Sequence, residues 1–165
     1  MLSQLGVLFV QWFLLILFVI EISGKLYLNW DHQFGIVEDH DLYDEISQDQ
    51  RGTALAVASL VFAGLAIILS DSPDQYVLQI EIFVAAFGFL LIAAFAHELT
   101  LTYRIVLTLQ EMALEYGLML MVWGIFLLIY EVTPETGPVL AIVSLAVFLF
   151  RFASLKGELE AHANE

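Results

Sequence analysis

Long runs of apolar residues constrain this chain more strongly than any other feature of its sequence. A helix needs about 20 apolar residues to cross roughly 30 Å of hydrocarbon. Several runs meet or approach that length, so the sequence predicts an all-α fold: a polytopic transmembrane helical bundle of about five spans, forming a single domain over residues 1–165. The predicted spans are residues 5–22, 53–70, 76–96, 105–130 and 138–155.

The overall composition agrees with a membrane protein and excludes several other classes. Hydrophobic residues make up 61% of the chain and charged residues 15%, whereas soluble domains are about half apolar and about a quarter charged. The net charge of −14 excludes a protein that binds nucleic acid through a basic surface. The absence of cysteine excludes disulfides, thiolate metal sites and thiol catalysis.

Basic residues near the ends of the predicted spans indicate how the chain is oriented. Lys and Arg at these positions mark the cytoplasmic side of a membrane. With five alternating spans, every basic residue falls on the same side; they are Lys25, Arg51, Arg104, Arg151 and Lys156. The sequence therefore predicts a multi-pass protein of the cell membrane, with its N-terminus outside and its C-terminus inside.

The segment between the first two spans, residues 26–51, is acidic and is predicted to be cytoplasmic. Leu42, Tyr43 and Ile46 follow a spacing of three to four residues, which predicts a weakly amphipathic helix that can continue into the second span. Acidic residues occur in every loop, so we interpret them as a halophilic-like adaptation to high salt. The alternative is an acidic mouth that concentrates cations.

Small residues predict which spans pack together, because helices in a membrane associate where small side chains let their backbones approach. The second, third and fifth predicted spans are rich in Ala, Gly and Ser, and we expect them to lie in close contact. The first span carries bulky side chains, so we expect it to be peripheral or to contact another protomer. A bundle of this size has little room for an internal aqueous path, so a pore would form between protomers.

Glutamates within the predicted spans are the candidate ion-pathway residues. Charged groups are costly in hydrocarbon and usually face a partner or water. Glu81 lies about 7–8 Å along the third span, while Glu111 and Glu115 lie one turn apart on one face of the fourth. We expect these three carboxylates to bind a cation or a proton. The structural alternative for Glu81 is that its side chain reaches the membrane interface.

A second group of ionisable residues clusters between the third and fourth predicted spans. His97, Glu98 and Arg104 are expected to tune the nearby carboxylates or to form ion pairs with them. The structural alternative is a belt of ion pairs in which arginine neutralises Glu98, Glu111 and Glu115. Glu21 precedes Lys25 by four residues, and we interpret this pair as a simple ion pair without a function.

These features favour a small homo-oligomeric channel or carrier for a cation or a proton. The alternative is a non-catalytic membrane subunit or assembly protein that binds a membrane-protein partner and has structural buried acids. Besides these partners we expect the lipid bilayer and no nucleic acid.

We predict neither an enzyme nor a cofactor nor a metal site. An intramembrane enzyme that uses His97, Glu98 and Glu115 is a third hypothesis, but no Ser-His-Asp arrangement, zinc-protease motif or EF-hand is recognisable. His97 is the histidine nearest to a span, which disfavours a haem held by two histidines of one protomer.

Overall fold

A computed structural model of the chain describes residues 17–25, 27, 40–71, 73–100, 103–136, 139, 142–143, 146 and 149–150. In this part of the chain the regular elements are helices, which confirms the all-α class. They are α3 (His40–Asp71), η1 (Pro73–Gln75), α4 (Val77–Phe95), α5 (His97–Thr100), α6 (Arg104–Val132) and η2 (Pro134–Thr136). Residues 17–25 are also helical.

Three of these helices are long and apolar enough to cross a membrane. Their apolar segments are Asp41–Ser70, Val77–Phe95 and Arg104–Val132, which match the second, third and fourth predicted spans. Most of the first and fifth predicted spans lies outside the described residues, as does most of the acidic loop before residue 40. The total number of spans and the orientation of the termini therefore stay predictions.

Helix α3 is longer than a membrane span requires. The amphipathic stretch and the second predicted span form one continuous helix of 32 residues. At 1.5 Å per residue this helix is about 48 Å long, against roughly 30 Å of hydrocarbon. Except for Asp71, its charged residues lie before Gly52, so the His40 end is the part that is not needed to cross the hydrocarbon. Gly52 does not interrupt the helix, in line with a cost of about 1 kcal/mol relative to alanine.

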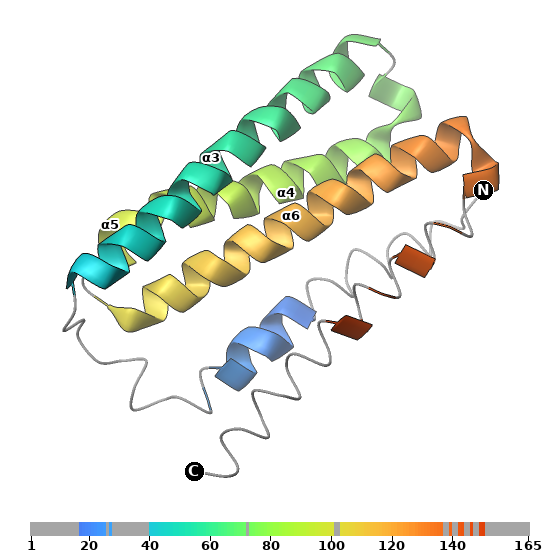
Figure 1. Cartoon of the computed structure of the whole chain (residues 1–165). Coiled ribbons are helices and arrows are strands. Elements are labelled where there is room, and N and C mark those ends of the chain that lie inside the picture. The colour runs from blue at the N-terminus through green and yellow to red at the C-terminus, as the bar shows by residue number, and fades with distance from the viewer. Residues whose placement is uncertain are drawn as a thin grey trace. The chain divides into compact units, whose positions relative to one another are not determined.

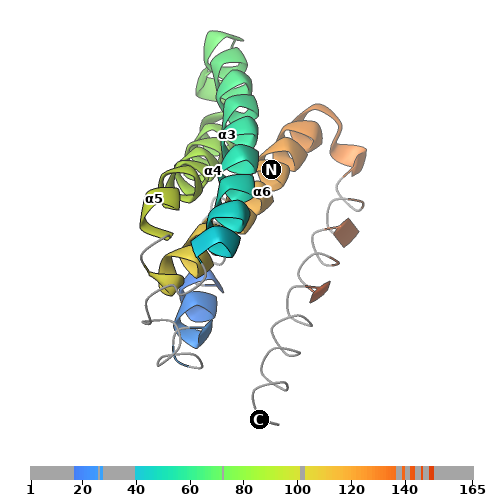
Figure 2. The same ribbon diagram turned by 60° about the vertical axis from the view of Figure 1, so that its left-hand side comes forward.

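The chain divides into two compact units, Met1–Gly124 and Ile125–Glu165, and each is described by itself. In the first unit, α3, α4 and the part of α6 that ends at Gly124 run side by side (Figure 1). Figure 2 shows α3 and α4 joined through η1 at one end, with α5 at the other end.

The core of the first unit is formed by residues that recur at spacings of three and four. This spacing is typical of helices that pack at a small angle to one another. On α3 the buried apolar residues are Ala54, Ala58, Val61, Leu65 and Ile68. On α4 the buried residues are Gln79, Ile82, Phe83, Ala86, Leu90, Ala93 and Ala94. On α6 they are Gln110, Met112, Ala113, Tyr116, Gly117, Leu120 and Gly124.

Small residues bring these three helices close together. The second and third predicted spans are in contact, as expected, whereas most of the fifth span lies outside the described residues, so its contact with them stays a prediction. Alanines of all three helices meet in one cluster, which consists of Ala54, Ala93, Ala94 and Ala113. A Cβ atom added to Gly117 would lie 2.8 Å from Leu90 Cγ, and one added to Gly124 would lie 3.0 Å from ring atoms of Phe83. Glycine at these two positions therefore sets the distance between α4 and α6.

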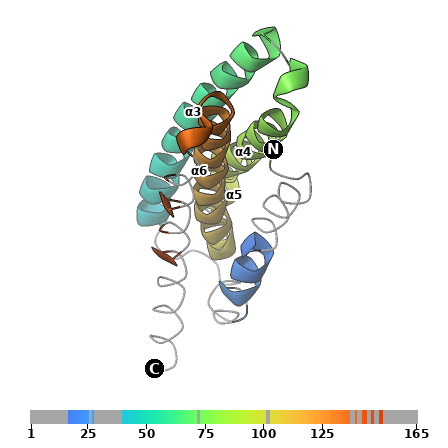
Figure 3. The ribbon, with the colours of Figure 1, turned by 90° about the vertical axis from the view of Figure 1, so that its right-hand side faces the viewer.

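The described end of the first predicted span contacts α4 and α6 through one face. Phe18 packs edge-on against Phe89 of α4 and Tyr116 of α6, with ring centroids 5.1 and 5.0 Å apart. Figure 3 shows helix 17–25 beside the beginning of α6. The bulky aromatic side chain gains from burial and from edge-to-face contact with two other rings. Val19 and Ile20 of the same helix stay exposed, so the expectation of a peripheral or protomer-contacting first span stays a prediction.

The second unit contains the end of α6 and η2. Pro134 has no N–H to donate and disfavours helical geometry at the preceding residue, so α6 ends at Val132. The Thr133 hydroxyl donates to the carbonyl of Ile129 at 2.9 Å, and the Thr133 amide donates to the same carbonyl at 2.8 Å. These bonds satisfy a carbonyl in the last turn of the helix.

Candidate functional site

A cluster of buried polar side chains joins three helices at the end of the first unit that contains α5. Ser47 of α3, Thr100 of α5 and Gln110 of α6 are each 0% exposed. Polar groups buried in this way are costly unless they are hydrogen-bonded. Their hydrogen bonds therefore decide what the cluster can do.

Ser47 and Gln110 bind each other through two hydrogen bonds. The Gln110 Nε2 amide donates to the backbone carbonyl of Ser47 at 3.0 Å, and the Ser47 hydroxyl donates to Gln110 Oε1 at 2.6 Å. The Thr100 hydroxyl lies 3.1 Å from Gln110 Oε1 and 3.0 Å from the Ala96 carbonyl. Because a threonine has one hydroxyl proton, these two acceptors share it. The cluster therefore ties α3 and α5 to α6.

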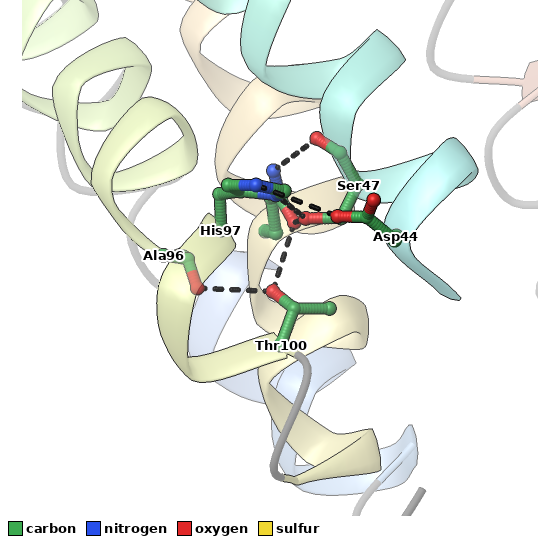
Figure 4. Close-up of polar contacts among 6 residues, drawn as sticks. Asp44, Ser47, Ala96, His97 and Thr100 are labelled. Carbon is green, nitrogen blue, oxygen red and sulfur yellow. Dashed lines mark hydrogen bonds and ion pairs between the residues drawn. The ribbon is translucent and has the colours of Figure 1, made fainter. Parts of the chain in front are cut away.

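His97 extends the cluster toward its surface. Its Nδ1 atom lies 2.9 Å from Ser47 Oγ, and its Nε2 atom lies 3.7 Å from Asp44 Oδ1. The His97 side chain is 14% exposed and that of Asp44 is 50% exposed. Figure 4 shows the His97 ring directed from α5 toward Ser47 and Asp44 of α3. The ring thus connects a fully buried hydroxyl with a half-exposed carboxylate.

The local fold of α5 places His97 and Thr100 on the cluster. The carbonyl of Ala96 accepts from the amides of Leu99 and Thr100, and the carbonyl of Leu99 accepts from the amide of Tyr103. These bonds turn the chain through one short helix between α4 and α6. Residues three apart share a helix face, so His97 and Thr100 both point toward Gln110 and Ser47.

The structure brings together a serine, a histidine and an aspartate that the sequence did not associate. A catalytic triad needs a serine that can donate its proton to the histidine. Here the Ser47 hydroxyl donates its proton to Gln110 Oε1, 2.6 Å away, and Ser47 is 0% exposed. Ser47 is therefore arranged as a structural hydrogen-bond donor and not as a nucleophile.

A second buried polar contact involves Glu21, which is 3% exposed. The Tyr116 hydroxyl donates to Glu21 Oε2 at 2.9 Å, and Lys25 Nζ lies 4.0 Å from Glu21 Oε1. The sequence predicted the pair with Lys25 but not the bond to Tyr116. Tyr116 is 1% exposed, and its ring also packs against Phe18. Glu21 thus links helix 17–25 to α6.

The predicted ion-pathway glutamates do not come together in one place. Glu81 and Glu111 are exposed, and Glu115 is half-buried. Leu90 of α4 packs on Gly117 of α6, and Phe83 packs on Gly124, so the two helices run in opposite directions. Glu81 lies near Phe83 and Glu115 lies near Gly117, which places the two carboxylates about 15 Å apart along the helix axes.

Of the residues predicted to tune the glutamates, His97 joins the polar cluster. Glu98 is exposed beside it on α5, and Arg104 is half-buried at the start of α6. Sequence reasoning missed Ser47, Asp44, Thr100 and Gln110. The polar side chain of Gln110 inside an apolar span was the available signal, since an uncharged amide also needs a partner there.

Among the described residues, no group of three or more His, Cys, Asp or Glu side chains has an arrangement that could hold a metal ion. Comparison with protein-family models, curated proteins and solved structures gives no significant match for this chain. In the described helices the buried polar side chains are the three of the cluster together with Glu21 and Gln79.

Proposed function

We propose that this protein is a small oligomeric channel or carrier for a cation or a proton in the cell membrane. The observation that carries the proposal is the position of Glu111 and Glu115 on α6. They lie one turn apart in an apolar segment, with Glu111 exposed and Glu115 half-buried. A carboxylate on the surface of a membrane helix needs water, a cation or a polar partner.

The pathway in this proposal runs between copies of the protein. Alanines and glycines let α3, α4 and α6 pack closely, which argues against an ion path between these helices within one protomer. Association of copies would instead cover exposed glutamates and enclose water along a symmetry axis. Glu111 and Glu115 would form one binding station, and Glu81 would form another about 15 Å away. Glu98, Arg104 and His97 would tune the first station.

Flux measurements in proteoliposomes test the proposal. Fluxes of K⁺, Na⁺ and H⁺ are measured separately for the wild type and for Glu81→Gln, Glu111→Gln and Glu115→Gln. We expect selective flux in the wild type and a loss of at least about tenfold in Glu115→Gln, because the amide does not carry the charge that binds the ion. Glu131→Gln is the matched control, since Glu131 is exposed near the end of α6. Flux equal to that of empty liposomes for all three ions would contradict the proposal.

A non-catalytic subunit that binds a membrane-protein partner is the second candidate. The observation in its favour is that buried polar groups pair with one another, as Ser47 does with Gln110 and Glu21 with Tyr116. Such pairing stabilises a fold without a bound ligand, as a structural role in a larger assembly requires. Native mass of the protein purified from its own membrane separates the candidates. A homo-oligomer supports the channel or carrier, and a stoichiometric second protein supports the subunit.

A further inference from the structure

The hydrogen positions in the polar cluster follow from its heavy-atom geometry. A backbone carbonyl can only accept, so the Gln110 atom facing the Ser47 carbonyl must be the amide nitrogen. The other end of the amide, Oε1, is then an acceptor that lies 2.6 Å from Ser47 Oγ. Two oxygens at that distance need a proton between them, and the Ser47 hydroxyl supplies it.

This assignment fixes the tautomer of His97. The one proton of the Ser47 hydroxyl is used toward Gln110, so Ser47 Oγ can only accept from the ring nitrogen 2.9 Å away. His97 Nδ1 must therefore carry a hydrogen. In the neutral ring the other nitrogen, Nε2, then has a lone pair and no hydrogen.

The lone pair of Nε2 is directed at a second acceptor. Asp44 Oδ1 lies 3.7 Å from His97 Nε2, so in the neutral form two groups that accept hydrogen bonds face each other. A proton on Nε2 replaces this repulsion by an attraction between imidazolium and carboxylate. Asp44 is half-exposed, which gives the pair access to water.

We infer that His97 and Asp44 form a binding site for one proton at the α5 end of the bundle. Ser47 and Gln110 are the positioning residues of this site, because they hold Nδ1 as a donor and leave Nε2 to take up the proton. The proton binds to His97 Nε2, and no other covalent bond forms or breaks. It adds Asp44, Ser47 and Gln110 to the functional residues and does not depend on ion transport.

Other charged residues lie on the elements that pack against His97. They are Asp41 and Glu45 on α3, Glu98 on α5, and Arg104 and Glu111 on α6. The acidic members of this group are exposed, so water screens their effect on the ring. Asp44 is the carboxylate that contacts His97 directly, and its removal is therefore the sharpest test.

Nitrogen NMR of the intact protein in lipid nanodiscs, labelled with ¹⁵N-histidine, tests the inference. The chain contains 4 histidines, and the signals of His97 are those that disappear in His97→Gln. We expect neutral His97 to be the Nδ1–H tautomer and to gain its second proton on Nε2 as the pH falls. In Asp44→Asn the proton should bind about twofold to fivefold more weakly, a size typical of partly exposed ion pairs.

Two further variants test the positioning role. In Ser47→Ala the acceptor for Nδ1–H is gone, and in Gln110→Leu the freed Ser47 hydroxyl can donate to Nδ1. Both variants should convert neutral His97 to the Nε2–H tautomer. Ser59→Ala is the matched control, because the exposed Ser59 hydroxyl bonds only to the Leu55 carbonyl of its own helix. Helix content by circular dichroism and elution as a single species identify the variants that fold.

The outcomes separate this inference from the proposed function. A neutral Nε2–H tautomer in the wild type would overturn the inference, and so would unchanged proton binding in a folded Asp44→Asn variant. Absence of ion flux in the wild type, together with the expected NMR result, would overturn the transport proposal alone. The expected tautomer, its conversion in Gln110→Leu and weaker proton binding in Asp44→Asn together establish the site.

Discussion

Individual polar residues in this protein act through partners that are distant in the sequence. Ser47 and Gln110 are 63 positions apart, and Glu21 and Tyr116 are 95 positions apart. In each pair, the hydrogen bond to the partner compensates the cost of burying a polar side chain among apolar helices. Replacing one member alone takes one hydrogen bond from the other, and a buried polar group that loses a bond is destabilised by more than the bond itself gains.

The Tyr116→Phe substitution tests this at the residue scale. It removes the hydroxyl that donates to the buried carboxylate of Glu21 and keeps the aromatic ring. We expect the free energy of unfolding to fall by about 1–2 kcal/mol. Reversible unfolding in mixed detergent micelles measures it. Tyr103→Phe is the control, because Tyr103 is 49% exposed, and an equal effect of both substitutions would show that the bond to Glu21 does not stabilise the fold.

At the scale of helices, small residues decide how closely the elements approach. Gly117 faces Leu90 and Gly124 faces Phe83, so α4 and α6 pack around large side chains that fit over glycine. In a membrane such fitting replaces the hydrophobic effect as the force that pairs helices. The order of the elements thus follows from the apolar runs, and their mutual register follows from the glycines and alanines.

Two glycine-to-alanine substitutions separate helix propensity from packing. Alanine is more favourable than glycine in a helix by about 1 kcal/mol. A Cβ atom added to Gly64 would have nothing within 4 Å, so Gly64→Ala should raise the free energy of unfolding. In Gly117→Ala the new Cβ would lie 2.8 Å from Leu90 Cγ and 3.3 Å from the Ala86 carbonyl oxygen. We expect Gly117→Ala to be about 1–3 kcal/mol less stable than Gly64→Ala. Equal stability of the two in the same unfolding assay would show that α4 and α6 are not closely packed.

At the scale of the whole molecule, the sequence predicts which ends of the three described helices lie on the same side of the membrane. The chain contains no cysteine, so a single introduced thiol reports the side on which it lies. Glu45 lies near the beginning of α3 and Glu98 lies on α5, whereas Asp74 lies between α3 and α4 and Glu135 follows α6. All four residues are exposed.

Labelling of single-cysteine variants in intact cells tests the predicted orientation. An impermeant maleimide should label Asp74→Cys and Glu135→Cys from outside, because the positions of the basic residues predict that the opposite loops are cytoplasmic. Glu45→Cys and Glu98→Cys should become labelled at least about tenfold faster after permeabilisation, which also serves as their control. The reverse pattern would show an inverted chain, and labelling of Asp74→Cys and Glu135→Cys from opposite sides would contradict the count of spans between them.

The sequence by itself determined the three long helices of the described part. Spans predicted at 53–70, 76–96 and 105–130 correspond to helices at 40–71, 77–95 and 104–132. This agreement has a local cause, since a run of apolar residues must form hydrogen bonds within itself to enter hydrocarbon. The same reasoning identified Glu81, Glu111 and Glu115, because a charged residue in an apolar run is visible without knowledge of the fold.

Only the tertiary structure decided which side chains meet. Uncharged Ser47 and Gln110 give a weak signal in the sequence, and their pairing depends on the register of α3 against α6. That register is set by side-chain volumes across the helix interfaces, which no local pattern specifies. The contact of His97 with Ser47 and Asp44, and of Glu21 with Tyr116, follow from the same packing. Hydrophobic length thus fixes the elements, and close packing of small residues fixes the polar cluster.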